Sequence, residues 1–168
     1  MKRLLFVNGP MGVGKTAVCQ ELLRSLQPSA YLDGDWCWKM APFLVTEETK
    51  AMVCDNIVSV LSRFLASPAL DHVILGWVMH RSEIARSILE RLELEDVEVR
   101  QFTLLCSEDT LRRRLMEDIR TGLRSMDALE RSAAYLPLYE EQSTVKIVTD
   151  RLSPSEVARL VVEQLGRA

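Results

Sequence analysis

The sequence predicts an α/β fold, a three-layer α/β/α sandwich built around a five-stranded parallel sheet. Short apolar runs alternate with longer amphipathic segments along the whole chain, which is the pattern of strands joined by crossover helices. The chain has 168 residues, of which 48% are hydrophobic and 27% charged, as in one globular domain. No repeat, linker or low-complexity tract divides it, so we expect a single domain over residues 1–168.

Five short apolar runs predict the strands. The third carries almost no polar residue, which indicates a central strand covered on both faces. The fourth is expected to contain an irregularity between Val99 and Phe102, where the alternation of apolar side chains changes phase. The runs are residues 3–8, 30–33, 72–78, 97–105 and 145–148.

Six segments with helical spacing of apolar residues predict the helices. Thr46 and Ser153 are expected N-caps, and a proline and an acid follow Ser153 in the first turn. Pro137 is expected to break the fifth helix. Residues 33–45 should form a loop or a short helical flap rich in large apolar side chains. The helices are expected at residues 17–26, 46–66 and 82–92, from 107 onward, at 127–139, and from 153 onward.

Residues 9–16 match the phosphate-binding pattern G-x-x-x-x-G-K-[ST] at every fixed position, between an expected strand and an expected helix. The glycines let backbone N–H groups surround phosphate oxygens, and the helix N-terminus adds partial positive charge. Lys15 is expected to reach the β- and γ-phosphates, and the Thr16 hydroxyl to ligate Mg²⁺. The residues expected to bind ATP here are Gly9, Met11, Gly12, Val13, Gly14, Lys15, Thr16 and Ala17.

Two carboxylates, Asp33 and Asp35, follow the second strand on either side of Gly34. Such a pair divides the work of phosphoryl transfer, one supporting Mg²⁺ and the other accepting the proton of the attacking hydroxyl. Alone, the triplet is also ordinary turn chemistry. We expect Gly34 to permit a bend that turns Asp33 toward Thr16 and Asp35 toward the acceptor.

Together, residues 9–16 and 31–35 resemble the small-molecule kinases of the shikimate kinase and gluconate kinase type, within the nucleoside-monophosphate-kinase-like P-loop fold. The resemblance implies the strand order 2-3-1-4-5, with Asp33 in the Mg²⁺ shell and Asp35 on the substrate hydroxyl. It also implies a substrate flap at about residues 34–66 and a short lid at about 118–127. Two features depart from the group: Gly76 stands alone where shikimate kinases have three glycines, and the gluconate kinase signature is absent. We therefore infer neither substrate.

Arginines cluster between the fourth and fifth expected strands, and their planar charge suits phosphate oxygens and nucleobases. By resemblance, Arg114 would lie against adenine, and Arg120 or Arg124 would close on the transferring phosphoryl group. The alternative for each is a solvated helix face paired with neighbouring acids.

The expected substrate side is aromatic, because all three tryptophans follow the second or the third strand. Such a pocket suits a flat or apolar group, although packing under the flap explains any one tryptophan equally well. His80 is expected at the pocket rim, and Arg81 either clamps an anion or pairs with a neighbouring acid. The candidate substrate-binding residues are Asp35, Trp36, Trp38, Phe43, Trp77, His80 and Arg81.

The sequence thus predicts a cytoplasmic kinase that uses ATP and Mg²⁺ to phosphorylate a hydroxyl of a small molecule, either a metabolite or an antibiotic. The catalytic candidates are Lys15, Asp35, Arg120 and Arg124. The alternatives are a nucleotide or nucleoside kinase, and a nucleotide-dependent binding or regulatory protein with slow hydrolysis. An AAA+-type motor would need a longer chain and an acidic second motif, and the guanine motif of GTPases is absent.

Composition limits the partners. The net charge of −3 argues against nucleic-acid and anionic-membrane binding, and no apolar run is long enough to span a membrane. The four cysteines lack metal or C-x-x-C spacing, which favours reduced, buried thiols. A monomer or a homodimer is expected.

Overall fold

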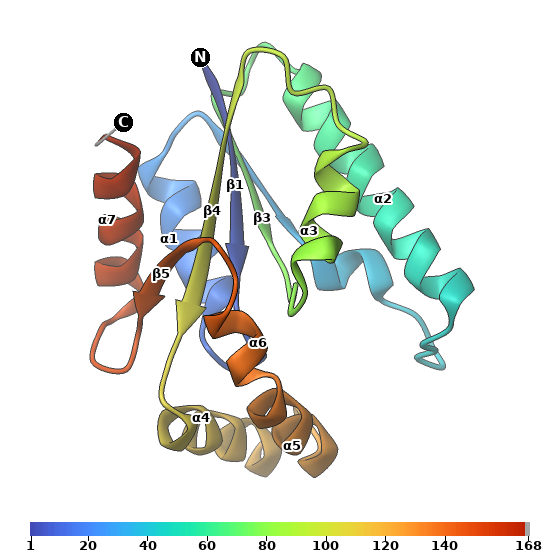
Figure 1. Ribbon diagram of the computed structural model, residues 1–168, viewed down its shortest axis with the longest axis vertical. Coiled ribbons are helices and arrows are strands. Elements are labelled where there is room, and N and C mark those ends of the chain that lie inside the picture. The colour runs from blue at the N-terminus through green and yellow to red at the C-terminus, as the bar shows by residue number, and fades with distance from the viewer. Residues whose placement is uncertain (167–168) are drawn as a thin grey trace.

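The computed structural model describes residues 1–166, and its five strands form one parallel sheet in the order β2-β3-β1-β4-β5 (Figure 1). Both the predicted fold class and the strand order are therefore confirmed. The strands are β1 (Lys2–Asn8), β2 (Ser29–Asp33), β3 (His72–Gly76), β4 (Val97–Leu105) and β5 (Val145–Val148).

Seven α-helices and one short 3₁₀ helix surround the sheet within the described residues. Thr46 and Ser153 cap their helices, as expected from the sequence, and each does so through a reciprocal capping box. The helices are α1 (Lys15–Ser25), η1 (the 3₁₀ helix, Gly34–Trp38), α2 (Glu47–Ala66), α3 (Ser82–Leu89), α4 (Glu108–Arg120), α5 (Met126–Ala134), α6 (Leu136–Glu140) and α7 (Pro154–Leu165).

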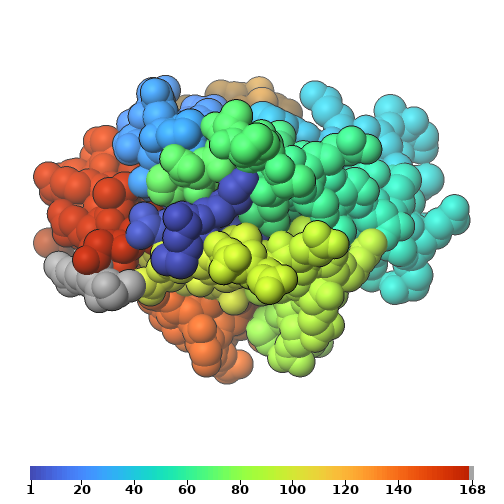
Figure 2. Space-filling model, turned by 90° about the horizontal axis from the view of Figure 1, so that it is seen from above, coloured from blue at the N-terminus to red at the C-terminus, as the bar shows by residue number. Residues whose placement is uncertain are grey.

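The alternation of side chains along β1 divides the hydrophobic core into two layers. Leu5 and Val7 pack into a cluster with α1 and α7, whereas Leu4 and Phe6 pack into a second cluster with α2 and α3. Figure 1 shows these two helix pairs on opposite sides of the sheet, and Figure 2 shows the start of β1 between α7 and α2. The molecule is therefore a three-layer sandwich.

Apart from shifts of one or two residues at the ends of other elements, four details differ from the sequence-based expectation. Strand β3 ends at Gly76, so that Trp77 and Val78 lie beyond it. Helix α3 ends at Leu89, and the break between α5 and α6 falls at Tyr135, because Pro137 occupies the first turn of α6, where its missing N–H costs nothing.

The fourth detail is that β4 contains no irregularity. It pairs with β1 in unbroken register from Val97 to Thr103. The alternation is lost because the second half of β4, from Phe102 onward, is buried on both faces, which favours apolar residues at successive positions.

The parallel strands bring their carboxyl ends to one edge of the sheet, where the loop after β1, helix η1 and the α4–α5 segment lie (Figure 1). All four cysteines are free thiols, but only Cys19 and Cys106 are buried. Within the described residues, no helix is both long enough and apolar enough to cross a membrane.

Candidate active site

The phosphate-binding loop connects β1 directly to α1. Gly14, with φ of 105°, adopts a left-handed conformation that favours glycine immediately before Lys15, the first residue of α1. Gly12 also has a positive φ, and a Cβ there would approach Leu115 of α4 to 2.7 Å. The loop is therefore tight against α4, and the N-terminus of α1 opens into the cleft.

Lys15 lies back along the loop rather than reaching into solvent. Its Nζ donates to the carbonyl oxygens of Gly9 at 2.8 Å and Pro10 at 2.9 Å. Burial lowers the pKa of Lys15 to about 8, an effect that the negative charge of Asp35 opposes. The ammonium group is thus held by the loop at the place where phosphate oxygens would bind.

Asp33 is 8% exposed and accepts hydrogen bonds from residues of α1, β2 and η1. Its Oδ2 accepts from the Thr16 hydroxyl at 3.3 Å and from the Tyr31 hydroxyl at 3.0 Å, and its Oδ1 accepts from the backbone N–H of Asp35 at 3.0 Å. Asp33 therefore both caps η1 and faces Thr16, as expected.

The pair of Thr16 and Asp33 fits Mg²⁺ better than a metal that needs many side-chain ligands. No group of three or more His, Cys, Asp or Glu residues within 1–166 is arranged to hold a metal. Mg²⁺ in nucleotide enzymes takes one or two protein ligands and completes its shell with phosphates and water. Thr16 would ligate the ion, and Asp33 would orient that hydroxyl or a bound water.

Gly34 is required for a reason that the sequence did not reveal. Its φ lies outside the left-handed region, so the expected backbone freedom is not what the turn uses. Instead, a Cβ at this position would lie 2.3 Å from Cγ of Trp77, because the indole packs directly on the glycine. The absence of a side chain at position 34 lets Trp77 lie against the turn that carries Asp35.

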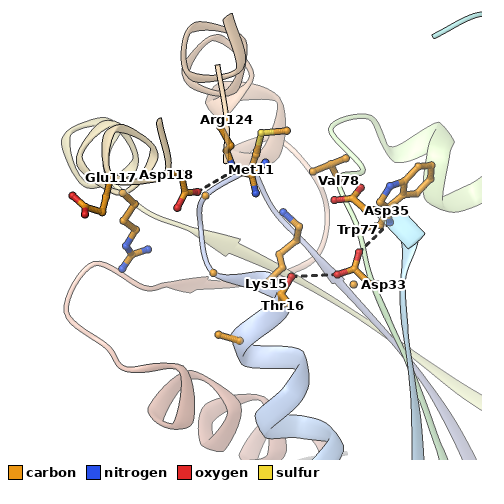
Figure 3. A pocket seen from close by; sticks show the side chains of 15 residues that line it. Met11, Lys15, Thr16, Asp33, Asp35, Trp77, Val78, Glu117, Asp118 and Arg124 are labelled. Carbon is orange, nitrogen blue, oxygen red and sulfur yellow. Dashed lines mark hydrogen bonds and ion pairs between the residues drawn. The ribbon is translucent and has the colours of Figure 1, made fainter. Parts of the chain in front are cut away.

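Asp35 lines the cleft opposite the phosphate-binding loop (Figure 3). Burial raises the pKa of its carboxyl group and the nearby charge of Asp33 raises it further, while Lys15 opposes both. A carboxylate whose pKa is raised in a cleft is a stronger base than an ordinary aspartate, which makes Asp35 a candidate proton acceptor.

The cleft has a volume of about 470 Å³ and is open to solvent on one side. Six of the eight residues expected to bind ATP line it, namely Met11, Gly12, Gly14, Lys15, Thr16 and Ala17, whereas Gly9 and Val13 do not. The other lining residues are Asp33, Asp35, Gly76, Trp77, Val78, Arg114, Glu117, Asp118 and Arg124.

The three candidate arginines occupy different positions. Arg114 lines the cleft and donates to the carbonyl of Val13 at 3.0 Å and to Thr149. Arg124 also lines the cleft, where its Nε donates to Asp118 at 3.0 Å (Figure 3). Arg120 is exposed, pairs with Glu117 at 3.5 Å and does not line the cleft. Of the two lid arginines left open by the sequence, only Arg124 faces the site.

The aromatic residues of the flap lie outside the cleft. Trp36 and Phe43 are each 62% exposed. Trp36 packs at an angle against Tyr31, with ring centroids 5.8 Å apart, and Trp38 packs against Phe43 at 5.4 Å. Only Trp77 of the three tryptophans lines the cleft, so the structure does not gather the expected aromatic pocket around Asp35 in this conformation.

His80 and Arg81 line a second cleft of about 640 Å³, between the start of α3 and α6. The His80 ring stacks on Tyr135 with centroids 4.5 Å apart, and burial together with Arg81 lowers its pKa. The chain turns after Val78, and Met79 is buried, so His80 and Arg81 emerge on a different side from Trp77. They are not brought together with the other expected substrate residues.

Sequence reasoning missed Asn8, the buried last residue of β1. Its Oδ1 accepts from the backbone N–H groups of Gly9 and Met79, both at 2.8 Å, and its Nδ2 donates to the Met79 carbonyl and to Gln142. The available signal was a lone amide at the end of an otherwise apolar strand, directly before the phosphate-binding loop.

A family model described as an AAA domain matches residues 5–131, from β1 to α5, which is more than half of the chain. The chain belongs to the AAA domain family. In this AAA domain, β3 carries no acid, so the acidic second motif that we associate with AAA+-type motors is absent from that strand. No curated protein matches the sequence closely enough to count as a relative.

Solved structures share the fold of this AAA domain along its whole length. The tunicamycin resistance protein of Deinococcus radiodurans has a TM-score of 0.71 at 20% identity, covering 100% of this chain and 98% of that one. A gluconokinase from Sinorhizobium meliloti has a TM-score of 0.71 at 18% identity, with 97% and 91% covered. Shikimate kinase from Acinetobacter baumannii, in complex with shikimate, has a TM-score of 0.67 at 20% identity, with 98% and 93% covered. The resemblance inferred from residues 9–16 and 31–35 is therefore confirmed at the level of the P-loop fold.

Proposed function

We propose that this protein is a Mg²⁺- and ATP-dependent phosphotransferase that moves the γ-phosphoryl group of ATP to a hydroxyl of a small molecule. One observation carries the proposal: the Asp35 carboxylate and the Lys15 ammonium group line the same cleft from opposite sides (Figure 3). A nucleotide switch needs Lys15 but has no use for a second carboxylate across the cleft.

The roles follow from position. The loop N–H groups and Lys15 hold the β- and γ-phosphates, and Thr16 would hold a Mg²⁺ ion, whose positive charge would offset that of the phosphates. The acceptor oxygen forms a bond to the γ-phosphorus, the bond to the β,γ-bridging oxygen breaks, and ADP leaves. Asp35 orients the acceptor hydroxyl and takes its proton, and Arg124 stabilises charge on the transferring group.

The distribution of positive charge supports an acceptor without a phosphate or carboxylate group. We call residues 33–52 and 76–79 the acceptor half of the site. Its basic residues are Lys39 and Lys50, both exposed, and Lys50 pairs with Glu47 at 2.8 Å. Arg81, the expected clamp for a nucleotide substrate, lies on the second cleft. These positions favour a neutral hydroxyl compound over a nucleoside monophosphate.

Names of the similar structures keep two acceptor classes open. Gluconokinase and shikimate kinase are named for hydroxylated acids of metabolism, whereas the tunicamycin resistance protein is named for an antibiotic. Because the acceptor half lacks a buried cation and carries exposed aromatic side chains, we favour neutral metabolites and antibiotics over sugar acids.

The test is acceptor-dependent release of ADP from Mg-ATP across matched pairs that differ in one charged group, such as glucose with gluconate and thymidine with thymidine monophosphate. Hydroxylated antibiotics complete the panel. We expect a neutral member to raise ADP release and its anionic partner to be the poorer substrate. Lys15→Ala provides the control for contaminating kinases. Tight binding of Mg-ATP without transfer to any member would favour the binding or regulatory protein instead.

A further inference from the structure

Asn8 connects the phosphate-binding loop to the opposite wall of the cleft. Its side chain is 4% exposed and uses its full hydrogen-bonding capacity, accepting from Gly9 and Met79 and donating to Met79 at 2.9 Å and Gln142 at 3.0 Å. Gln142 in turn donates to the same Met79 carbonyl at 2.8 Å. One buried amide thus joins β1, the segment after β3 and the segment before β5.

The segment held in this way, residues 77–79, forms the acceptor wall. It lies past the last paired residue of β3, so the sheet ladder fixes it only through the Trp77 N–H, which donates to the Val7 carbonyl at 3.2 Å. The two bonds between Asn8 and the Met79 backbone replace the missing strand pairing. Buried networks with every member satisfied impose one arrangement on the groups they join.

The position of this wall sets the surroundings of Asp35. Trp77 packs on Gly34 so closely that no Cβ fits between them, and its indole lies beside Asp35 (Figure 3). The indole Nε1 is buried and has no hydrogen-bond partner in the described part of the chain. A small shift of the wall therefore changes whether this N–H can donate to the Asp35 carboxylate or to an acceptor oxygen.

We propose that Asn8 is a positioning residue, which holds the Trp77–Met79 wall in register with the phosphate-binding loop and so keeps Asp35 aligned with the γ-phosphate. The catalytic part of this proposal rests on the proposed function, whereas the placement of the wall does not. Misplacement of a reacting group by about 1 Å can lower a rate by roughly 10²-fold.

Asn8→Asp keeps the hydrogen bonds that the side chain accepts and removes those that it donates. The aspartate oxygens still accept from Gly9 and Met79, but the donors to the Met79 carbonyl and Gln142 are lost. Gln142→Leu removes only the outer part of the network and gives a milder form of the same defect. Thr103→Val is the matched control, because Thr103 is fully buried, pairs with Asn8 across β1 and β4, and forms its side-chain hydrogen bond with Thr144 rather than with the loop or the wall.

Each variant is made in a Trp36→Phe, Trp38→Phe background, which leaves Trp77 as the single tryptophan. The readouts are acrylamide quenching of Trp77, the Kd of Mg-ATP by calorimetry, and kcat with an acceptor from the panel above. For Asn8→Asp we expect increased quenching and a kcat lowered by about 10²-fold, with the Kd of Mg-ATP unchanged. Gln142→Leu should shift quenching and kcat in the same direction by less, and Thr103→Val should shift neither.

The proposal is overturned if Trp77 quenching and kcat in Asn8→Asp match those of Thr103→Val. Should Asn8→Asp fail to fold, Gln142→Leu decides alone, and unchanged Trp77 quenching in that variant overturns the proposal. Increased quenching in a protein whose wild type phosphorylates no member of the panel would support the placement of the wall and count against the proposed function.

Discussion

The two halves of the site are built differently. Around the phosphate-binding loop, polar side chains are anchored: Lys15 bonds two loop carbonyls, Arg114 bonds Val13 and Thr149, and Thr16 bonds Asp33. In the acceptor half, by contrast, the flap presents exposed apolar side chains, including Trp36 and Phe43. Phosphate needs a fixed backbone, whereas an acceptor must enter and then be enclosed, so the flap, unlike the phosphate-binding loop, cannot be preorganised without its ligand.

Lys15 and Asp35 mark the boundary between the halves, and burial shifts their pKa values toward each other. The pKa of Lys15 is lowered to about 8 and that of Asp35 is raised, while the charge of each partner opposes the shift of the other. Bound phosphates would favour the charged form of Lys15 again. The pH dependence of binding and catalysis can therefore test each half separately.

The largest effect is expected from Lys15→Ala. Losing charge-assisted hydrogen bonds to the β- and γ-phosphates should raise the Kd of Mg-ATP by roughly 10²-fold or more and abolish transfer, with the fold retained. The Lys15 ammonium group loses its proton as the pH rises through about 8, so wild-type affinity for Mg-ATP should weaken there. Calorimetric titrations across this pH range measure both effects, and the pH dependence should vanish in the variant. Equal affinity of variant and wild type for Mg-ATP would mean that the nucleotide does not bind at this loop.

Asp35→Asn is expected to act on the other half. It keeps the size of the side chain but removes the proton acceptor, so kcat should fall by roughly 10²–10⁴-fold while the Kd of Mg-ATP barely changes. Because the pKa of Asp35 is raised, its carboxylate is protonated at a higher pH than that of an exposed aspartate. Wild-type kcat should therefore decline on the acid side at a higher pH than an unperturbed aspartate would give.

The pH profile of kcat distinguishes a base from an orienting group. If Asp35 takes the proton, the decline of kcat at acid pH disappears in Asp35→Asn. If Asp35 mainly orients the hydroxyl, kcat falls in the variant but still declines at acid pH. Asp33→Asn is the companion variant, and it should instead raise the Mg²⁺ concentration needed for half-maximal rate. Full activity of Asp35→Asn with a verified acceptor would exclude both roles.

Arg124 and Arg120 offer a matched comparison within the lid. Arg124 lines the cleft beside Asp118, whereas Arg120 is exposed and outside it. Arg124→Ala should lower kcat by roughly 10²-fold through lost stabilisation of the transition state, and Arg120→Ala should leave kcat close to wild type. Steady-state kinetics of the two variants measure this difference. A larger loss of kcat in Arg120→Ala than in Arg124→Ala would mean that the lid rearranges enough to exchange the positions of the two side chains.

The contrast between the halves also explains what the sequence could predict. The helix caps and the positions of Lys15, Thr16 and Asp33 follow from local patterns, because each depends on residues close in the chain. The strand order came instead from the resemblance of residues 9–16 and 31–35 to the small-molecule kinases. Helix α1 begins two residues earlier than expected only because the loop ends directly on it.

Features that depend on packing between distant segments were not predictable. Gly34 is needed to admit Trp77, which is 43 positions away in the sequence. The placement of His80 and Arg81 on the second cleft follows from the burial of Met79, which Asn8 and Gln142 hold from other elements. Spacing along the chain carries no information about such contacts, and of the expected substrate residues the structure brings only Asp35 and Trp77 to the cleft.

The smallest effect is expected from the flap tryptophans. If the flap closes over the acceptor, the exposed indole of Trp36 and the Trp38–Phe43 pair become part of the binding surface, and closure excludes water. Replacing Trp36 and Trp38 together by Leu should raise the KM of the acceptor by roughly 3- to 10-fold, which corresponds to the loss of one or two aromatic contacts, while kcat for transfer stays close to wild type.

Two further measurements make this prediction specific to the flap. Wild-type tryptophan emission should change on addition of the acceptor. The double variant should lose most of that change, because its one remaining tryptophan, Trp77, is buried. Acceptor-free ATP hydrolysis should proceed at the same rate in both proteins, since the flap is open in both. Val148→Ala, an exposed apolar position on β5, controls for the loss of surface apolar area. An acceptor KM that is the same in the double variant and in Val148→Ala would mean that the two tryptophans only pack against Tyr31 and Phe43, and that acceptor recognition lies entirely with Asp35 and the wall that carries Trp77.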